Sequence, residues 1–211
     1  MQDASGIGRR LVLVRHGEST WNALGIVQGQ ADAPGLTDEG RRQAAALARQ
    51  LQGRPVVSLL SSDLTRARQT AEVIARQLGA PVTLDERVRE RNLGVLEGGP
   101  VTALAGAGVD AGGVVDADAR PSGGESVRDL YDRVARFVDS VTEGPDGDVV
   151  VVCHGGTIRV ASAYLDGVAP DAMEWRAVDN TEVATFEMAG RGRQAVGVEV
   201  GPVTHVEGGH R

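Results

Sequence analysis

Short apolar runs alternate along the chain with longer amphipathic stretches. Residues 11–14 (LVLV), 56–60 (VVSLL) and 148–152 (DVVVV) are almost wholly apolar, which is typical of strands buried on both faces of a sheet. A short strand is also expected at residues 81–84, and two more at 182–188 and 194–200 form a predicted closing hairpin.

Four amphipathic segments separate these strands. Thr37 is the expected N-cap of a helix that ends before Gly53. The residue three positions after it is Gly40, which has no side chain to complete a capping box, so only the threonine half of the motif is present. Ser62 or Asp63 is the expected cap of the next helix, and further helices are predicted at residues 125–141 and near 157–165. Alternation of this kind predicts an α/β fold with a mostly parallel sheet flanked by helices on both faces.

Residues 98–124 differ from the rest of the chain because they are rich in glycine and alanine and show little periodicity. We expect a flap or lid inserted into a single domain that spans residues 1–211, because a long loop within a compact domain is usually functional or disordered. Residues 201–211 are expected to form a loose tail that leaves His205 and His210 in solvent.

Composition removes several classes of function. The net charge of −7 and the lack of a basic run argue against nucleic-acid binding, and no apolar run is long enough to span a membrane. Cys153 is the only cysteine, so an intramolecular disulfide is excluded, and the absence of lysine excludes Schiff-base and Walker-type chemistry. We expect a cytoplasmic protein, with a homodimer as the default oligomer.

One local pattern occurs twice. His16-Gly17 and His154-Gly155 each follow a predicted buried strand directly. Parallel strands bring their carboxyl ends to one edge of the sheet, so the two imidazoles converge if the strands are neighbours. A glycine after each histidine allows backbone N–H groups to approach an anion closely.

The surroundings of these histidines favour an anion over a metal. Arg15 offers a planar cationic fork suited to phosphoryl oxygens, and Arg66 lies in the first turn of a predicted helix, where anions bind well. Arg15 would repel a zinc ion, and no CxxC or HExxH motif is present. We therefore predict an anion pocket with no metal and no other cofactor.

These residues match a known pattern. Residues 15–22 (RHGESTWN), 28–29 (QG), 36–40 (LTDEG), 61–72 (SSDLTRARQTAE), 121–126 (PSGGES) and 153–156 (CHGG) resemble the signature segments of the histidine phosphatase superfamily, the phosphoglycerate mutase-like proteins. The resemblance covers roughly residues 9–190. It implies a three-layer sandwich and, as ligand, a small phosphorylated metabolite.

The resemblance also implies roles for individual residues. His16 would attack phosphorus and become phosphohistidine, while Arg15, Arg66 and His154 would hold the phosphoryl oxygens. Glu90 would protonate the leaving oxygen and then activate water. Glu86 and Glu97 lie in the same loop, and spacing alone does not choose between the three. The remaining predicted phosphate-binding residues are Asn22, Gln28, Gly29 and Gly155.

Phosphatase and mutase are both compatible with these motifs. Gln28-Gly29 resembles the phosphatase branch, and residues 98–124 contain a single basic residue, Arg120, whereas mutases place several basic residues there. The segment 90–94 (ERNLG) instead resembles the acid segment of the mutases. We predict a metal-independent phosphomonoesterase, with phosphoglycerate mutase-type transfer as the alternative.

A second motif competes within the same residues. Residues 153–159 (CHGGTIR) fit the CxxGxxR loop of cysteine-dependent phosphatases, in which a thiolate at a helix N-terminus is the nucleophile. Val160 stands where that family has Ser or Thr, and the motif leaves Arg15, Arg66 and Glu90 unexplained. A catalytically inactive phosphopeptide-binding module is a third alternative, to be distinguished by binding without turnover.

Overall fold

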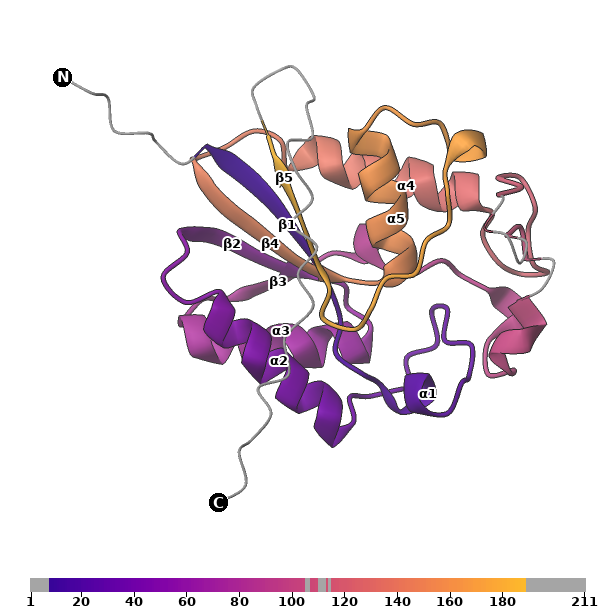
Figure 1. Ribbon diagram of the computed structural model, residues 1–211, viewed down its shortest axis with the longest axis horizontal. Helices are drawn as coiled ribbons and strands as arrows, with labels where there is room; N and C mark the ends of the chain where they lie inside the picture. The colour runs from indigo at the N-terminus through magenta and orange to yellow at the C-terminus, as the bar shows by residue number, and fades with distance from the viewer. Residues whose placement is uncertain (1–7, 105–106, 110–112, 114, 189–211) are drawn as a thin grey trace.

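The computed structural model describes residues 8–104, 107–109, 113 and 115–188. Its centre is a five-stranded sheet with the strand order β3-β2-β4-β1-β5 (Figure 1). The strands are β1 (Arg9–Arg15), β2 (Val56–Ser61), β3 (Val82–Leu84), β4 (Gly147–Cys153) and β5 (Val183–Glu187). β5 runs antiparallel to β1 and the other neighbours are parallel, so the prediction of a mostly parallel sheet is confirmed.

Helices cover both faces of the sheet. α2 (Asp38–Gln50) and α3 (Thr65–Leu78) lie on one face, and α4 (Val127–Ser140) and α5 (Gly155–Leu165) lie on the other (Figure 1). The apolar residues of β1 and β4 alternate between two hydrophobic clusters, one under each helix pair. Leu11 and Leu13 face the α4–α5 side, whereas Val12 and Val14 face the α2–α3 side. This is why residues 11–14 of β1 and 149–152 of β4 are apolar at every position.

Short elements complete the described chain. They are α1 (Thr20–Ala23) and the 3-10 turns Glu86–Val88, Gly94–Leu96, Val101–Leu104 and Pro170–Ala172. No helix in the described ranges is long and apolar enough to cross a membrane.

Several predicted boundaries were wrong at the helix ends. α3 begins after Leu64, an apolar residue that supplies no side-chain cap, and the hydroxyl of Ser62 both accepts the N–H of Leu64 at 3.3 Å and contacts His154. α4 begins after Ser126, whose hydroxyl accepts the N–H of Asp129 in a capping box. α5 begins at Gly155, earlier than the predicted Thr157. Thr37 is confirmed as the cap of α2, accepting the N–H of Gly40.

Two predictions fall wholly outside the described residues, namely the strand at 194–200 and the tail at 201–211. The predicted flap at 98–124 is described in part. Pro100 bridges to Ile26, and Val109 bridges to Val115, so the described part of the flap is tied to the body and to itself.

Close backbone packing fixes the loop that follows β1. A Cβ atom built on Gly40 would lie 2.0 Å from the carbonyl oxygen of Glu18, and one built on Gly17 would lie 2.5 Å from the carbonyl oxygen of Gly40. Only glycine fits at either position without backbone movement. Thr70 of α3 accepts the N–H of Gly17 at 3.1 Å. Helices α2 and α3 therefore hold the segment after β1 in place.

We expect Gly40→Ala to lower the free energy of unfolding by about 3 kcal/mol, because its methyl group must displace backbone rather than a flexible side chain. Urea unfolding followed by circular dichroism measures the change. Gly8→Ala is the matched control, because a Cβ at Gly8 meets nothing within 4 Å. Wild-type stability of Gly40→Ala would contradict the close packing described above.

Candidate active site

Two histidines meet at the carboxyl ends of β1 and β4. The strands pair in parallel with Arg15 opposite Cys153, and the N–H of His16 donates to the carbonyl of Cys153 at 3.0 Å. His16 and His154 are therefore neighbours, with ring centroids 5.2 Å apart. Both side chains are buried. The convergence predicted from the two His-Gly pairs is present in the structure.

The hydrogen bonds of His16 define its tautomer. Nδ1 lies 2.7 Å from the carbonyl oxygen of Gly17, and because a carbonyl can only accept, Nδ1 must carry the proton. Nε2 is then left with its lone pair, toward which the Nε of Arg66 donates at 3.3 Å. Burial, followed by the nearby cations Arg66 and Arg15, lowers the pKa of His16 well below its ordinary value of 6.5. His16 is thus a neutral imidazole whose unprotonated ring nitrogen is Nε2.

Arg66 is buried and held by backbone oxygens. Its two terminal nitrogens donate to the carbonyls of Ala31 at 3.0 Å and Gly29 at 2.8 Å. Burial lowers the pKa of Arg66 to about 10, which still leaves the side chain charged at neutral pH. Arg15 is anchored in a similar way by the carbonyl of Val178, at 2.5 Å. Carbonyl anchors fix both guanidinium groups without neutralising them.

His154 is buried to the same extent as Arg66. Its Nε2 lies 2.9 Å from the hydroxyl of Ser62, while its Nδ1 is buried with no hydrogen-bond partner within the described part of the chain. Burial, followed by the charges of Arg66 and Arg15, lowers the pKa of His154 well below its ordinary value. An unsatisfied buried nitrogen is costly, so this atom points to a partner that arrives with a ligand.

The three candidate acids occupy different surroundings. Glu90 lines the cavity beside His16 and accepts the backbone N–H groups of Arg91 at 2.7 Å and Gly156 at 3.0 Å. Glu97 is outside the cavity lining and uses one oxygen to accept two backbone N–H groups. Glu86 is exposed and pairs with Arg89. Of the three, Glu90 alone faces the cavity.

A single arginine side chain fixes the loop that carries Glu90. Arg133 of α4 donates to the backbone carbonyls of Arg87, Arg89 and Glu90, and also pairs with Glu125 at 2.8 Å. The carboxylate of Glu90 is therefore presented from a rigid loop.

These groups surround a cavity of about 540 Å³. Of the residues that the sequence assigns to phosphate binding, Asn22, Gln28 and Gly29 line the cavity, whereas His154 and Gly155 are not among its lining residues. Asn22 uses its oxygen to cap α1 with Ser19, and Gln28 accepts from the same serine at 2.7 Å. Part of the predicted flap contributes to the wall, through Val101, Thr102, Leu104, Ala107 and Val109.

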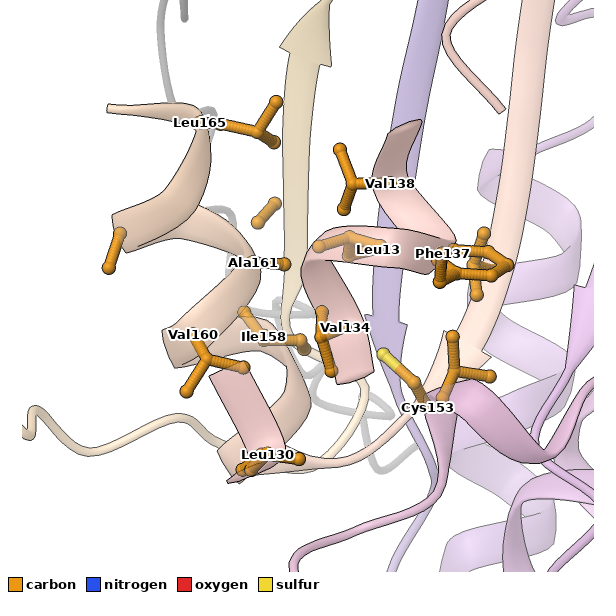
Figure 2. Packing of buried hydrophobic residues seen from close by; sticks show 14 of the residues in the cluster. Leu13, Leu130, Val134, Phe137, Val138, Cys153, Ile158, Val160, Ala161 and Leu165 are labelled. Carbon is orange, nitrogen blue, oxygen red and sulfur yellow. The ribbon is translucent and has the colours of Figure 1, made fainter. Parts of the chain in front are cut away.

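The position of Cys153 in the hydrophobic core does not suit a nucleophile. Figure 2 shows its sulfur among apolar side chains on the α4–α5 side of the sheet, near Val134 and Ile158. Its side chain is fully buried, and burial raises the pKa of the thiol far above its ordinary value. A thiolate does not form there at neutral pH. The cavity lining does not include Cys153.

Within the described ranges, no group of three or more His, Cys, Asp or Glu side chains is arranged to hold a metal ion. The cluster around His16 is rich in arginine instead. Its chemistry suits a dianion such as a phosphoryl group, whose oxygens accept hydrogen bonds from several cationic donors.

Sequence reasoning missed some residues of the site. The sequence predicts Ser62 as a helix cap, whereas its hydroxyl contacts His154, and the sequence points to Arg159 only through the cysteine motif, whereas the residue lines the cavity. Trp175 also lines the cavity from a segment that the sequence left without a role. Ser62 directly follows β2, the same strand-end signal that located the histidines, whereas Arg159 and Trp175 stand in no such pattern.

Comparison with known proteins agrees with this geometry. Residues 11–200 match the model of the histidine phosphatase superfamily, branch 1. The chain belongs to this family. The resemblance read from the sequence motifs is confirmed, and so is the phosphoglycerate mutase-like fold.

Relatives of known name fall on both sides of the phosphatase–mutase division. The chain is 40% identical over 173 residues to a glucosyl-3-phosphoglycerate phosphatase from Mycolicibacterium vanbaalenii (77% of this chain, 76% of the relative). It is 36% identical over 174 residues to a probable phosphoglycerate mutase from Yersinia enterocolitica (77% of each chain).

Solved structures similar to this chain include phosphatases. A mycobacterial glucosyl-3-phosphoglycerate phosphatase in complex with VO3 superposes with a TM-score of 0.75 and 35% identity, covering 84% of this chain and 92% of the other. A histidine-to-alanine variant of phosphoserine phosphatase from Entamoeba histolytica, in complex with phosphoserine, gives a TM-score of 0.79 and 29% identity, covering 94% and 99%. The chain is a phosphoric monoester hydrolase of the histidine phosphatase type, as its sequence predicted.

The lowered pKa values of His16 and His154 make stability depend on pH. Below about pH 6.5 the unfolded chain binds protons on both histidines that the folded protein excludes, so acid favours unfolding. We expect His16→Asn to reduce the slope of unfolding free energy against pH by up to about 1.4 kcal/mol per pH unit. This reduction begins near pH 6.5 and ends at the folded-state pKa.

Urea unfolding at a series of pH values between 7 and about 5 measures this slope. His154→Asn should flatten it by a similar amount, since that histidine is buried in the same cluster. A slope identical to the wild type in both variants would show that neither imidazole is held neutral in the fold.

Proposed function

We propose that this chain is a metal-independent phosphomonoesterase that hydrolyses a small phosphorylated metabolite through a phosphohistidine formed on His16. The observation that carries the proposal is the tautomer of His16. Its Nδ1–H is fixed on the carbonyl of Gly17, so a lone pair on Nε2 faces Arg66 within a cluster of cationic donors. That arrangement prepares a nitrogen nucleophile beside a site for an anion.

In the first step, Nε2 of His16 attacks phosphorus in line and forms the N–P bond as the ester P–O bond breaks. Glu90 transfers its proton to the leaving alcohol oxygen, so the alcohol departs neutral. Arg15, Arg66 and the Nδ1–H of His154 stabilise the negative charge on the equatorial phosphoryl oxygens. The unsatisfied Nδ1 of His154 supports this last role.

In the second step, water attacks the phosphohistidine. Glu90, now a carboxylate, accepts a proton from that water as the new P–O bond forms and the N–P bond breaks. Inorganic phosphate leaves, and His16 returns to its neutral form. Glu90 is suited to both steps because it reaches the cavity from a loop that Arg133 holds rigid.

Phosphoglycerate mutase-type transfer is the second candidate, since one relative carries that name. A mutase must retain a second anionic group while the phosphoryl group moves. Arg120, the single basic residue of the predicted flap, is paired with Asp129 at 2.6 Å and does not line the cavity. This favours hydrolysis. We also propose a cytoplasmic location, where small phosphorylated metabolites are abundant.

His16→Ala should lower kcat for p-nitrophenyl phosphate by at least about 10³-fold, because it removes the nucleophile. Cys153→Ala should stay within about threefold of the wild type, because its thiol is buried in the core and remains protonated. Steady-state rates, measured on variants whose circular dichroism matches the wild type, decide between His16 and Cys153 as the nucleophile. An inactive, folded Cys153→Ala together with an active His16→Ala would reverse the assignment.

Glu90→Gln should slow poor leaving groups selectively. Alkyl phosphates leave as strongly basic alkoxides and need the acid, so their turnover should fall by about 10²–10⁴-fold, whereas p-nitrophenolate leaves without help. If breakdown of phosphohistidine limits turnover, both substrates slow together and the phosphoenzyme accumulates.

Glu97→Gln is the matched control for this experiment, because Glu97 lies in the same loop but outside the cavity lining. Leaving-group selectivity in Glu97→Gln, with wild-type behaviour in Glu90→Gln, would transfer the acid role to Glu97.

A further inference from the structure

Ser62 carries a buried hydroxyl at the end of β2 that the proposed mechanism does not use. The residue is buried, and its side-chain oxygen lies 2.9 Å from Nε2 of His154. The backbone fixes the place of this oxygen, because the N–H of Ser62 continues the β2–β4 pairing by donating to the carbonyl of Val152 at 2.9 Å. The sheet therefore holds Ser62 against the ring of His154.

The hydrogen of this hydroxyl needs an acceptor. Among the described residues, the side chain of Ser62 has two hydrogen-bond partners, the N–H of Leu64 at 3.3 Å and the ring of His154. The N–H of Leu64 can only donate, so the oxygen of Ser62 accepts there. A buried hydroxyl is expected to place its hydrogen on an acceptor, and the ring nitrogen of His154 is the one that remains. Ser62 therefore donates to Nε2 of His154.

The direction of this hydrogen bond fixes the tautomer of His154. Burial, followed by the positive charges of Arg66 and Arg15, lowers the pKa of His154 well below its ordinary value, so the ring is neutral and carries a single hydrogen. Because Nε2 accepts from Ser62, that hydrogen lies on Nδ1, the nitrogen without a partner among the described residues. The opposite tautomer would leave two buried groups unsatisfied instead of one, namely the hydroxyl hydrogen of Ser62 and the lone pair on Nδ1.

The two histidines of the site thus have their tautomers set by different partners. The carbonyl of Gly17 accepts from Nδ1 of His16, which leaves a lone pair on Nε2. The hydroxyl of Ser62 donates to Nε2 of His154, which leaves a hydrogen on Nδ1. A nucleophile needs the lone pair, whereas a group that binds phosphoryl oxygens needs the hydrogen, because those oxygens accept hydrogen bonds and repel a lone pair. Each histidine therefore has the tautomer that its role requires.

We propose that Ser62 is a positioning residue that holds His154 in the Nδ1–H tautomer, so that the ring presents a hydrogen to the phosphoryl group. This inference rests on the proposed phosphatase function for the identity of the ligand, whereas the tautomer is a property of the enzyme without ligand. Ser62 is not among the residues that line the cavity, so its effect on turnover passes through His154.

The tautomer is measured on the wild-type protein. Long-range proton–nitrogen correlation spectra of the nitrogen-15-labelled protein at neutral pH distinguish protonated from unprotonated ring nitrogens, and comparison with His154→Asn assigns the signals of this histidine. We expect Nδ1 of His154 to be protonated and Nε2 to be unprotonated. The Nε2–H tautomer in the wild type would overturn the inference without any variant of Ser62.

Ser62→Ala removes the hydrogen that fixes the ring. We expect the Nε2–H tautomer of His154 to become populated, and kcat/KM for p-nitrophenyl phosphate to fall by about 10–100-fold, the range for loss of a hydrogen bond to a charged group. Ser61→Ala is the matched control, because Ser61 is adjacent and equally buried but its hydroxyl donates to a backbone carbonyl. This control should keep the wild-type tautomer and turnover.

A merely structural role of Ser62 would lower stability without changing the tautomer of His154. A folded Ser62→Ala that keeps the Nδ1–H tautomer, or that loses it with no loss of kcat/KM, would therefore contradict the proposal. An equal change of tautomer in Ser61→Ala would also contradict it, because that variant leaves the hydroxyl of Ser62 in place.

Failure of the proposed function is recognised separately. Titration of His16→Ala with inorganic phosphate needs no turnover. The Nδ1–H signal of His154 should shift downfield as phosphate binds, and adding Ser62→Ala should weaken phosphate binding by about 10-fold. This result supports the role of Ser62 even if the wild type does not hydrolyse p-nitrophenyl phosphate, whereas equal affinity with and without Ser62 contradicts it. Absence of phosphate binding in His16→Ala would count against the proposed function, while the tautomer of His154 in the wild type still tests Ser62.

Discussion

Parallel pairing of β1 with β4 is the constraint on which the whole site depends. The register that sets Arg15 opposite Cys153 brings both strands to an end at the same level, so the residues that follow, His16 and His154, become neighbours. A shift by one residue would turn the alternating apolar side chains to the wrong faces and separate the imidazoles. The pairing of β2 with β4 places Ser62, which follows β2, beside His154. The β1–β4 pairing therefore sets both the core packing of these strands and the geometry of the two histidines.

The charged and polar groups at the carboxyl ends of β1 and β4 favour a negatively charged ligand. Arg66 and Arg15 are held by the carbonyls of Gly29, Ala31 and Val178, dipoles that position a cation without cancelling it. The buried histidines respond by remaining neutral. A phosphoryl dianion would satisfy the cations and the open Nδ1 of His154 together. A neutral His16 is also the form that can attack phosphorus, so one electrostatic arrangement serves both binding and nucleophilicity.

The sequence predicts those features that follow from the periodicity of apolar residues and from the positions of strand ends. Buried strands are read from apolar runs, and the paired His-Gly sequences located the catalytic edge because parallel strands end together. Features that depend on tertiary contact were missed. Ser62 looks like a helix cap until the strands place it beside His154, and α1 is a single turn capped by Ser19 inside what reads as a polar loop. The choice of Glu90 over Glu97 rests on which carboxylate lines the cavity, which spacing does not encode.

The central claim is that Nε2 of His16 carries the phosphoryl group during turnover. Quenching the enzyme in alkali during steady-state hydrolysis of p-nitrophenyl phosphate preserves phosphohistidine, and peptide mass spectrometry then locates the modification. Because Nδ1 is occupied by the carbonyl of Gly17, the account predicts a single phosphate on His16, as the Nε2 isomer. A phosphate found on Cys153, or the Nδ1 isomer on His16, would contradict it.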